Sequence, residues 1–243
     1  MRLYGLIGYP LAHSFSKKYF TEKFEKEGFY NCRYENFPIV SIDKVKAVLE
    51  LNPELKGLNV TIPYKEQVIP YLSEANDIVQ QIKACNCIRI VDEKLFGYNT
   101  DVIAFERSLK KELQPYHNKA LILGTGGAAK AVAFVLEKLD IEYRYVSRKS
   151  SSQNLTYDQV TRAIINDHLL IINTTPLGML HHIVEIPLLP YDALSSKHFL
   201  FDLIYNPEKT LFLKKGEERG AVIKNGYEML VIQAEESWRI WNI

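Results

Sequence analysis

The feature that most constrains the fold is a glycine-rich turn between an apolar run and an amphipathic segment. Residues 121–123 (LIL) read as a buried strand, and residues 124–129 (GTGGAA) follow directly. Apolar residues then recur at helical spacing, at Val132, Val135, Leu136 and Leu139. A strand that turns tightly into a helix begins a β-α-β unit, which requires a parallel sheet. The chain is therefore predicted to contain a doubly wound α/β domain.

The glycine spacing is also that of a dinucleotide-binding turn. Gly124, Gly126 and Ala129 occupy the three small positions of the G-x-G-x-x-A fingerprint. Gly124 permits the tight turn, Gly126 lets the backbone approach a pyrophosphate, and Ala129 lets the helix pack close to the sheet. The helix N-terminus favours a bound anion because its free amides carry partial positive charge. A purely structural glycine turn is the alternative.

The end of the next predicted strand, residues 142–146, selects between the two nicotinamide dinucleotides. An NAD site usually carries an acidic side chain there, which accepts the ribose 2′-hydroxyl. This chain has Ser147, Arg148 and Lys149 instead. A guanidinium and an ammonium suit a 2′-phosphate. The sequence thus predicts NADP as the cofactor, against the alternative of two solvated basic residues at a strand end.

Residues 57–65 (GLNVTIPYK) form a second segment that can carry chemistry. Its β-branched residues favour a strand, and Pro63 suits the start of a helix better than the continuation of a strand. This pattern predicts Lys65 in the first turn of a helix, where a cation is disfavoured. Lys65 is therefore a candidate proton donor and acceptor. A solvated surface lysine is the alternative.

The composition excludes several classes of protein. The 243 residues carry 30 basic and 29 acidic side chains, so no positive excess is available for nucleic acid. No apolar run is long enough to cross a bilayer, and residues 1–8 have too short an apolar core for a signal peptide. We therefore expect a cytoplasmic protein with neither a nucleic-acid nor a membrane partner.

Cysteine and histidine give no sign of a metal centre. Cys32, Cys85 and Cys87 do not make a disulfide framework. Cys85 and Cys87 are two apart, but structural zinc usually takes four protein ligands and no second pair accompanies them. His181 and His182 are expected in a solvated loop. No metal is predicted.

The rest of the chain alternates predicted strands and helices. A polar stretch, residues 114–118, marks the start of a new unit. Residues 87–91 and 95–98 read as a hairpin. Further strands are predicted at 3–7, 58–62, 119–123, 169–172 and 199–203, and helices at 16–27, at 102–113 and after Gly226.

In their order along the chain, several segments resemble the shikimate dehydrogenase family. Residues 8–16 (GYPLAHSFS) are similar to its N-terminal substrate loop, and residues 59–65 match its catalytic-lysine segment. Residues 84–86 (ACN) and 97–101 (GYNTD) resemble the segments of a binding asparagine and the catalytic aspartate. The remaining matching segments are residues 124–129, 173–179, 205–207 and 226–233.

The resemblance implies two α/β domains across a cleft. A substrate-binding and catalytic domain would comprise residues 1–104 plus 226–243. An NADP-binding Rossmann-type domain would comprise residues 105–225. The implied activity is the reversible NADP-dependent reduction of 3-dehydroshikimate to shikimate, in the synthesis of aromatic amino acid precursors, by a monomer or homodimer.

The resemblance also implies roles for individual residues. Lys65 would be the general acid and base, with Asp101 as its partner. The implied substrate residues are Ser14, Ser16, Asn59, Thr61, Asn86, Tyr205 and Gln233, with the two serines at the carboxylate. The implied cofactor residues are Gly124, Gly126, Gly127, Ala128, Ala129, Ser147, Arg148, Lys149, Thr174, Gly226 and Met229. Helix capping by Ser14, Ser16 or Asp101 is the structural alternative.

Some positions depart from the family pattern. Lys17 follows Ser16 where proline is usual, and Phe20-Thr21 replaces a common His-Asn pair. The other departures are Cys87 for threonine, Ala104 for glycine and Ser147 for asparagine.

Three alternatives to the implied activity are considered: a quinate/shikimate dehydrogenase using NAD, a folate-linked dehydrogenase, and a non-catalytic dinucleotide-binding sensor. The presence of both Lys65 and Asp101 argues against the sensor.

Overall fold

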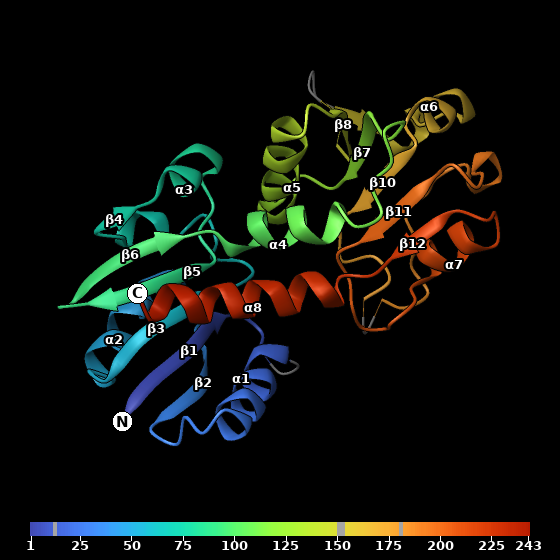
Figure 1. The fold of residues 1–243 in the computed structure, drawn as a ribbon. Helices are drawn as coiled ribbons and strands as arrows, with labels where there is room; N and C mark the ends of the chain where they lie inside the picture. Colours follow the sequence, from blue (N-terminus) through green and yellow to red (C-terminus); the bar gives the residue numbers. More distant parts are fainter. Residues whose placement is uncertain (12–13, 150–153, 180–181) are drawn as a thin grey trace. The chain divides into compact units, whose positions relative to one another are not determined.

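The computed structural model describes residues 1–11, 14–149, 154–179 and 182–243. The chain divides into two compact units (Figure 1). Unit 1 comprises Met1–Thr100 and Gln233–Ile243, and unit 2 comprises Asp101–Ile232. Both boundaries fall inside helices, α4 (Thr100–Leu109) and α8 (Tyr227–Trp241). Each unit has its own sheet, and the predicted α/β class is confirmed.

Unit 1 contains a mixed six-stranded sheet in the order β2-β1-β3-β5-β6-β4. Strand β1 lies between β2 and β3 and pairs in parallel with both, whereas β5 is antiparallel to both β3 and β6. The antiparallel β5–β6 pair confirms the predicted hairpin. The strand bounds are β1 (Arg2–Gly8), β2 (Cys32–Pro38), β3 (Leu55–Val60), β4 (Glu74–Ala75), β5 (Cys87–Val91) and β6 (Lys94–Tyr98).

Both faces of the sheet of unit 1 are covered, which explains why β1 is apolar almost throughout. Leu3 and Ile7 enter one apolar core, and the alternate residues Tyr4 and Leu6 enter another. The second core is aromatic and includes Trp241 of α8. The helical elements of this unit, besides α8, are α1 (Phe15–Lys26), η1 (Ile42–Lys44), α2 (Val45–Leu51), η2 (Ile69–Tyr71) and α3 (Asp77–Ile82).

Unit 2 contains a six-stranded sheet whose neighbouring strands all pair in parallel. The order β12-β11-β10-β7-β8-β9 runs outward in both directions from the β7–β10 pair, which confirms the doubly wound, Rossmann-type topology. The strands are β7 (Lys119–Leu123), β8 (Glu142–Ser147), β9 (Asn154–Thr156), β10 (Leu170–Asn173), β11 (Phe199–Asp202) and β12 (Val222–Lys224).

Helices of unit 2 provide the crossovers between its parallel strands. Helix α5 (Gly127–Lys138) packs on β7 and β8, and α7 (Leu211–Glu217) packs on β11 and β12. The remaining helical elements are η3 (Tyr157–Gln159), α6 (Arg162–Asp167) and η4 (Tyr191–Ala193). In the part of the chain that the structure describes, no helix has both the length and the apolar character that a bilayer span needs.

One predicted element is wrong, because residues 61–71, all described, contain no α-helix starting at Pro63. Turns follow β3 and lead into the short 3-10 helix η2. The segment is held by side chains instead: Tyr64 is buried and its hydroxyl donates to the Ile39 carbonyl at 2.7 Å. Pro70 lacks an amide and disfavours helix at the residue before it. The helix-dipole argument for Lys65 therefore fails.

Candidate functional site

The predicted cofactor residues follow the carboxyl ends of parallel strands in unit 2. Such ends share one edge of a doubly wound sheet, and ligands bind where the strand order reverses. Here the reversal lies between β7 and β10. Gly124 follows β7 and Thr174 follows β10, so these two predicted residues are neighbours at that point.

The turn at Gly124 requires a glycine. Its φ is +106°, and a Cβ at this position would lie 2.7 Å from Thr174 Oγ1. Thr174 donates to the Leu123 carbonyl from both its amide, at 2.9 Å, and its hydroxyl, at 2.6 Å. Thr174 therefore holds the end of β7 in place beside the turn.

Gly126, unlike Gly124, is not crowded by neighbouring atoms. It is the N-cap residue of α5, and a Cβ on it would meet no other described atom within 4 Å. Gly127 and Ala128 form the first turn, and Ala129 is buried. Open space in front of a helix N-terminus, with small residues around it, suits an anion approaching the backbone amides. These residues fit a dinucleotide pyrophosphate.

The end of β8 carries exposed positive charge. Ser147 closes the strand and its hydroxyl accepts from the Lys149 amide at 3.3 Å, while the side chains of Arg148 and Lys149 are exposed. These residues fit a 2′-phosphate.

Tyr205 follows the carboxyl end of β11, and Gly226 and Met229 follow that of β12. The Gly226 amide donates to the Ile204 carbonyl at 3.0 Å, next to Tyr205. A Cβ on Gly226 would lie 2.1 Å from the Leu203 carbonyl oxygen, so no other residue fits there. Met229 is buried in the first turn of α8, and burial raises the pKa of the Tyr205 phenol.

A buried carboxylate that sequence reasoning missed braces the same edge. Asp202 ends β11 and accepts from Asn173 Nδ2 at 3.0 Å, from the Ile204 amide at 3.0 Å and from Thr210 Oγ1 at 2.6 Å. Burial raises its pKa to about 6, against the hydrogen bonds, which lower it. Its only sequence signal is its place at the end of a predicted strand.

In unit 1 the predicted residues also gather at one edge of the sheet. Strands β1, β3 and β6 point the same way and β5 points the opposite way, so the ends of the first three lie beside the start of β5. Backbone hydrogen bonds join these segments: Thr61 donates to Ile7 at 3.0 Å, and Cys85 donates to Lys65 at 2.7 Å. The edge brings together Ser14, Ser16, Asn59, Thr61, Lys65 and Asn86.

Ser14 and Ser16 have unlike surroundings. Ser14 stands at the N-cap position of α1, but its side chain makes no capping bond. Its Oγ is buried and has no hydrogen-bond partner among the described residues. A buried hydroxyl in that state is costly unless a ligand pairs with it. Ser16 is buried and hydrogen-bonds with Tyr34. Residues 12–13 of the same loop lie outside the described residues.

Asn86, and not Asp101, holds the start of helix α4. Its Oδ1 accepts from the Thr100 amide at 2.7 Å, and its Nδ2 donates to Thr100 Oγ1 at 3.0 Å. Asp101 is the second residue of α4 and is buried. The capping alternative for Asp101 is therefore wrong.

The predicted catalytic pair is divided between the units. Lys65 is half-buried in unit 1, and Asp101 is the first residue of unit 2. Tyr205 also belongs to unit 2. Gln233 is 9% exposed and opens the helical segment that α8 contributes to unit 1.

Three positions that depart from the family pattern have distinct surroundings. Lys17 Nζ pairs with Glu35 at 2.6 Å, Ala104 is buried, and Cys87 is buried. Cys85 and Cys87 are both buried, and burial raises the pKa of the Cys87 thiol. His182 is exposed and pairs with Glu185 at 2.7 Å, whereas His181 lies outside the described residues.

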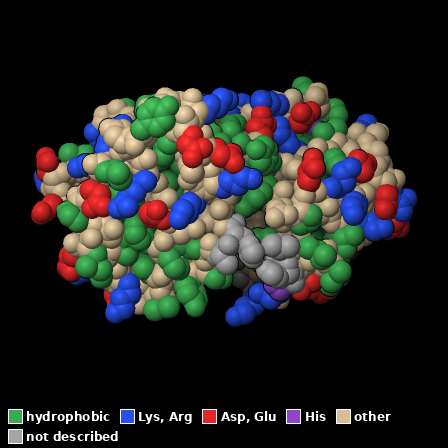
Figure 2. Space-filling view, turned by 90° about the horizontal axis from the view of Figure 1, so that it is seen from below, with side chains coloured by type: hydrophobic (Ala, Val, Ile, Leu, Met, Phe, Trp, Pro, Cys, Tyr) green, Lys and Arg blue, Asp and Glu red, His purple; other side chains and the backbone are tan. Residues whose placement is uncertain are grey.

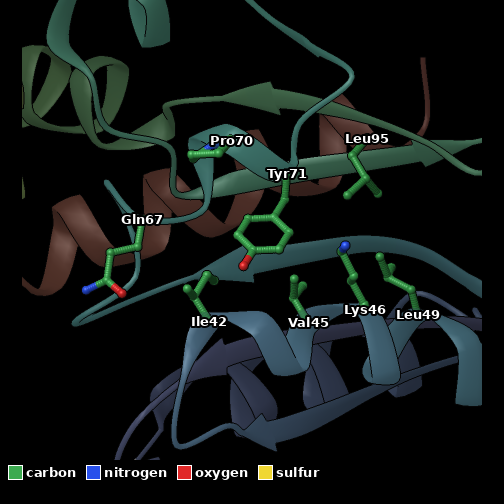
Figure 3. A pocket seen from close by; sticks show the side chains of 8 residues that line it. All are labelled: Ile42, Val45, Lys46, Leu49, Gln67, Pro70, Tyr71 and Leu95. Carbon is green, nitrogen blue, oxygen red and sulfur yellow. The ribbon is translucent and has the colours of Figure 1, made fainter.

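A separate groove of about 680 Å³ lies elsewhere on unit 1 (Figure 3). The ring of Tyr71 points toward Ile42 and Val45, and Lys46 Nζ lies 6.0 Å from the centroid of that ring. Its lining residues are Ile42, Val45, Lys46, Leu49, Gln67, Pro70, Tyr71 and Leu95. None of the predicted site residues lines this groove.

Charges of both signs are interspersed on the face shown in Figure 2. This mixture agrees with the formal net charge of +1. Recognition of charged ligands must therefore come from local groups such as Arg148 and Lys149.

The fold and its two residue clusters define a two-unit α/β protein with a dinucleotide-binding turn. Residues 6–88 match the family model of the shikimate dehydrogenase substrate binding domain. The chain is 38% identical to the NADP(+) shikimate dehydrogenase of Clostridium beijerinckii, covering 99% of this chain and 92% of that protein. The corresponding enzyme of Staphylococcus haemolyticus is 34% identical, with 98% and 91% covered.

Solved structures agree. Shikimate dehydrogenase from Aquifex aeolicus matches with a TM-score of 0.89 and 31% identity, covering 100% of this chain and 92% of that one. Shikimate 5-dehydrogenase from Thermus thermophilus, in complex with NADP(H) and shikimate, matches with a TM-score of 0.87 and 29% identity, covering 99% and 93%. The chain belongs to the shikimate dehydrogenase family.

Proposed function

We propose that this chain catalyses the reversible NADP-dependent reduction of 3-dehydroshikimate to shikimate, on the route to aromatic amino acids. The observation that carries the proposal is the gathering of six predicted substrate and catalytic residues at one sheet edge of unit 1. They come from three separate stretches of sequence, residues 8–16, 59–65 and 84–86. Relatives that match nearly the whole chain bear the name of this activity.

The cofactor is proposed to bind at unit 2. The turn at Gly124 and the amides of Gly127, Ala128 and Ala129 would hold the pyrophosphate. Ser147, Arg148 and Lys149 would bind the 2′-phosphate, and Thr174, Gly226 and Met229 complete the proposed set. When bound, the nicotinamide supplies hydride to the ketone carbon in one direction and accepts it in the other.

The side chains of the site would bind a small acid that carries several hydroxyls. Ser14 and Ser16 would donate to its carboxylate, and the buried Oγ of Ser14 supports this role. The other proposed substrate residues would pair with ring hydroxyls: Asn59, Thr61, Asn86, Tyr205 and Gln233. A site built to pair hydroxyls rejects analogues that lack them.

Lys65 is proposed as the general acid and base, with Asp101 as its partner. In the direction of shikimate formation, the ammonium would give a proton to the oxygen of the reacting carbonyl as negative charge develops there. In the reverse direction the neutral amine would take the proton from the hydroxyl.

A cytoplasmic location and a monomeric or homodimeric state of the protein stay predictions.

The test is NADP⁺ reduction by the purified protein with shikimate and quinate side by side, each repeated with NAD⁺. We expect shikimate with NADP⁺ to give the highest kcat/KM. Faster turnover of quinate with NAD⁺ would support the quinate dehydrogenase alternative. Cofactor binding without turnover of either substrate would contradict the proposal and support the sensor.

A further inference from the structure

A buried hydrogen-bond chain joins the proposed substrate residues of unit 1 through two side chains that sequence analysis did not single out. These are Tyr34, on β2, and Ser237, on α8. Both are buried, and both contact Asn59, which is itself only 4% exposed. Residues from three distant parts of the sequence thus meet at one amide.

Tyr34 connects Asn59 to Ser16. Its hydroxyl donates to Asn59 Oδ1 at 2.9 Å and hydrogen-bonds with the side chain of Ser16. Burial raises the pKa of the phenol well above its ordinary value, so the hydroxyl keeps its proton for this bond. The ring is held independently, stacked on Phe20 with centroids 4.7 Å apart and planes 12° apart.

Ser237 connects Asn59 to helix α8 and to Thr100. Its Oγ donates to the Gln233 carbonyl one turn earlier, at 2.8 Å, and accepts from Asn59 Nδ2 at 2.9 Å. Thr100 Oγ1 lies 3.5 Å from the same oxygen. Thr100 is itself bonded to Asn86, since its hydroxyl donates to Asn86 Oδ1 at 3.3 Å and accepts from Asn86 Nδ2 at 3.0 Å.

These bonds fix the orientation of the Asn59 amide. The Asn59 Nδ2 uses one hydrogen for Ser237 and the other for the Asn86 carbonyl, at 3.3 Å. The oxygen accepts from Tyr34 and has one further lone pair. Asn59 can therefore meet a ligand only as an acceptor from a hydroxyl. A flipped amide would place Oδ1 against the Asn86 carbonyl oxygen, acceptor against acceptor.

We propose that Tyr34 and Ser237 are positioning residues of the substrate site, which act by holding Asn59 in this one orientation. The inference rests on the proposed function, because its ligand is the same hydroxylated acid. Neither residue needs to touch that ligand. Their contribution is to orient Asn59 and to tie it to Ser16 and to the backbone of Gln233.

The main test is Tyr34→Phe, which removes the hydroxyl and keeps the stacked ring. We expect the KM for shikimate to rise about tenfold, the size of one lost hydrogen bond. The KM for NADP⁺ should match that of a control, Tyr4→Phe, whereas the Tm of Tyr34→Phe should be the lower of the two because Asn59 and Ser16 lose a buried partner. Tyr4 is buried in the same aromatic cluster, and its hydroxyl lies beside Arg2. Ser237→Ala should raise the shikimate KM in the same selective way.

A double-mutant cycle separates positioning from a general loss of packing. If Tyr34 acts through Asn59, Tyr34→Phe should have no further effect on the shikimate KM in an Asn59→Ala background. Additive effects would overturn the inference. So would a shikimate KM in Tyr34→Phe and Ser237→Ala that equals that of Tyr4→Phe. Wild-type protein that turns over neither shikimate nor quinate would instead overturn the proposed function, and this inference with it.

Discussion

In the proposed function, the two units would bind their ligands by opposite means. At the sheet edge of unit 1, buried side chains such as Asn59 and Asn86 are already bonded to other protein groups. At the sheet edge of unit 2, Gly126 faces open space and Arg148 is exposed. A small hydroxylated acid needs donors and acceptors at fixed orientations. A dinucleotide phosphate needs accessible amides and positive charge. Substitutions in unit 1 should therefore act by changing the orientation of hydrogen-bonding side chains. Substitutions in unit 2 should act by blocking the approach of a phosphate or by removing positive charge.

The largest effect should come from Lys65→Ala in unit 1. Loss of the proton donor and acceptor should lower kcat about 10²- to 10⁴-fold and leave NADP⁺ affinity nearly intact. Steady-state kinetics and a fluorescence titration with NADPH would measure the two quantities. Lys56→Ala, at an exposed position on β3, is the matched control. Unchanged turnover in Lys65→Ala would remove Lys65 from the mechanism.

Substitution of two glycines of unit 2 should separate a steric effect on NADP⁺ binding from an effect on the stability of the fold. Gly126→Ala places a methyl in open space, so its Tm should change little while NADP⁺ affinity falls about tenfold or more. Gly124→Ala forces a side chain into a positive φ and against Thr174, so both Tm and affinity should fall. Thermal unfolding with and without NADP⁺ compares them. Equal losses of Tm in both variants would contradict the distinction.

Cofactor choice should depend on charge at the end of β8. Arg148→Ala should lower kcat/KM for NADP⁺ about 10- to 100-fold, as expected for a lost charged hydrogen bond, and leave the value for NAD⁺ unchanged. Arg144→Ala is the control, since Arg144 is an exposed arginine on the same strand. A parallel loss with both dinucleotides would show that Arg148 does not bind the 2′-phosphate.

The smallest effect concerns the pH dependence of stability. The pKa of Asp202 is about 6 in the folded protein, above its ordinary 3.8, so the folded state holds this proton more tightly. Its contribution to stability is therefore full below about pH 4 and is lost as the pH rises through about 6. Asp202→Asn should remove this dependence, on the order of 1–3 kcal/mol. Urea unfolding across that range, with the exposed Asp158→Asn as control, would measure it.

Local signals were sufficient for much of the fold. The glycine turn after residues 119–123 and the alternation of strands and helices predicted the Rossmann-type topology, because that topology follows from local chirality and crossover rules. The segment after Pro63 was predicted wrongly for the opposite reason. Buried Tyr64 and Val68 hold it through contacts with distant parts of unit 1. A prediction from local propensity contains no such contacts.

The buried hydrogen-bond chain through Tyr34 and Ser237 could not be predicted from the sequence for the same reason. Tyr34 and Ser237 are single polar residues in apolar surroundings, with no periodic pattern. Only the sheet order, with β1 between β2 and β3, brings Tyr34 near Asn59. The four-residue spacing of Gln233 and Ser237 was the one available signal, since it places both on the same face of a helix.

The aromatic core of unit 1 sets an order of events during synthesis. Trp241 packs against Gly57, where a Cβ would lie 2.3 Å from its ring, and its Nε1 donates to the Ile88 carbonyl at 3.0 Å. The first hundred residues thus lack part of their core until residues 233–243 have been made. Unit 2 is continuous in sequence, so its fold does not depend on residues 233–243. On the ribosome, the second unit along the chain can therefore be the first to complete its fold.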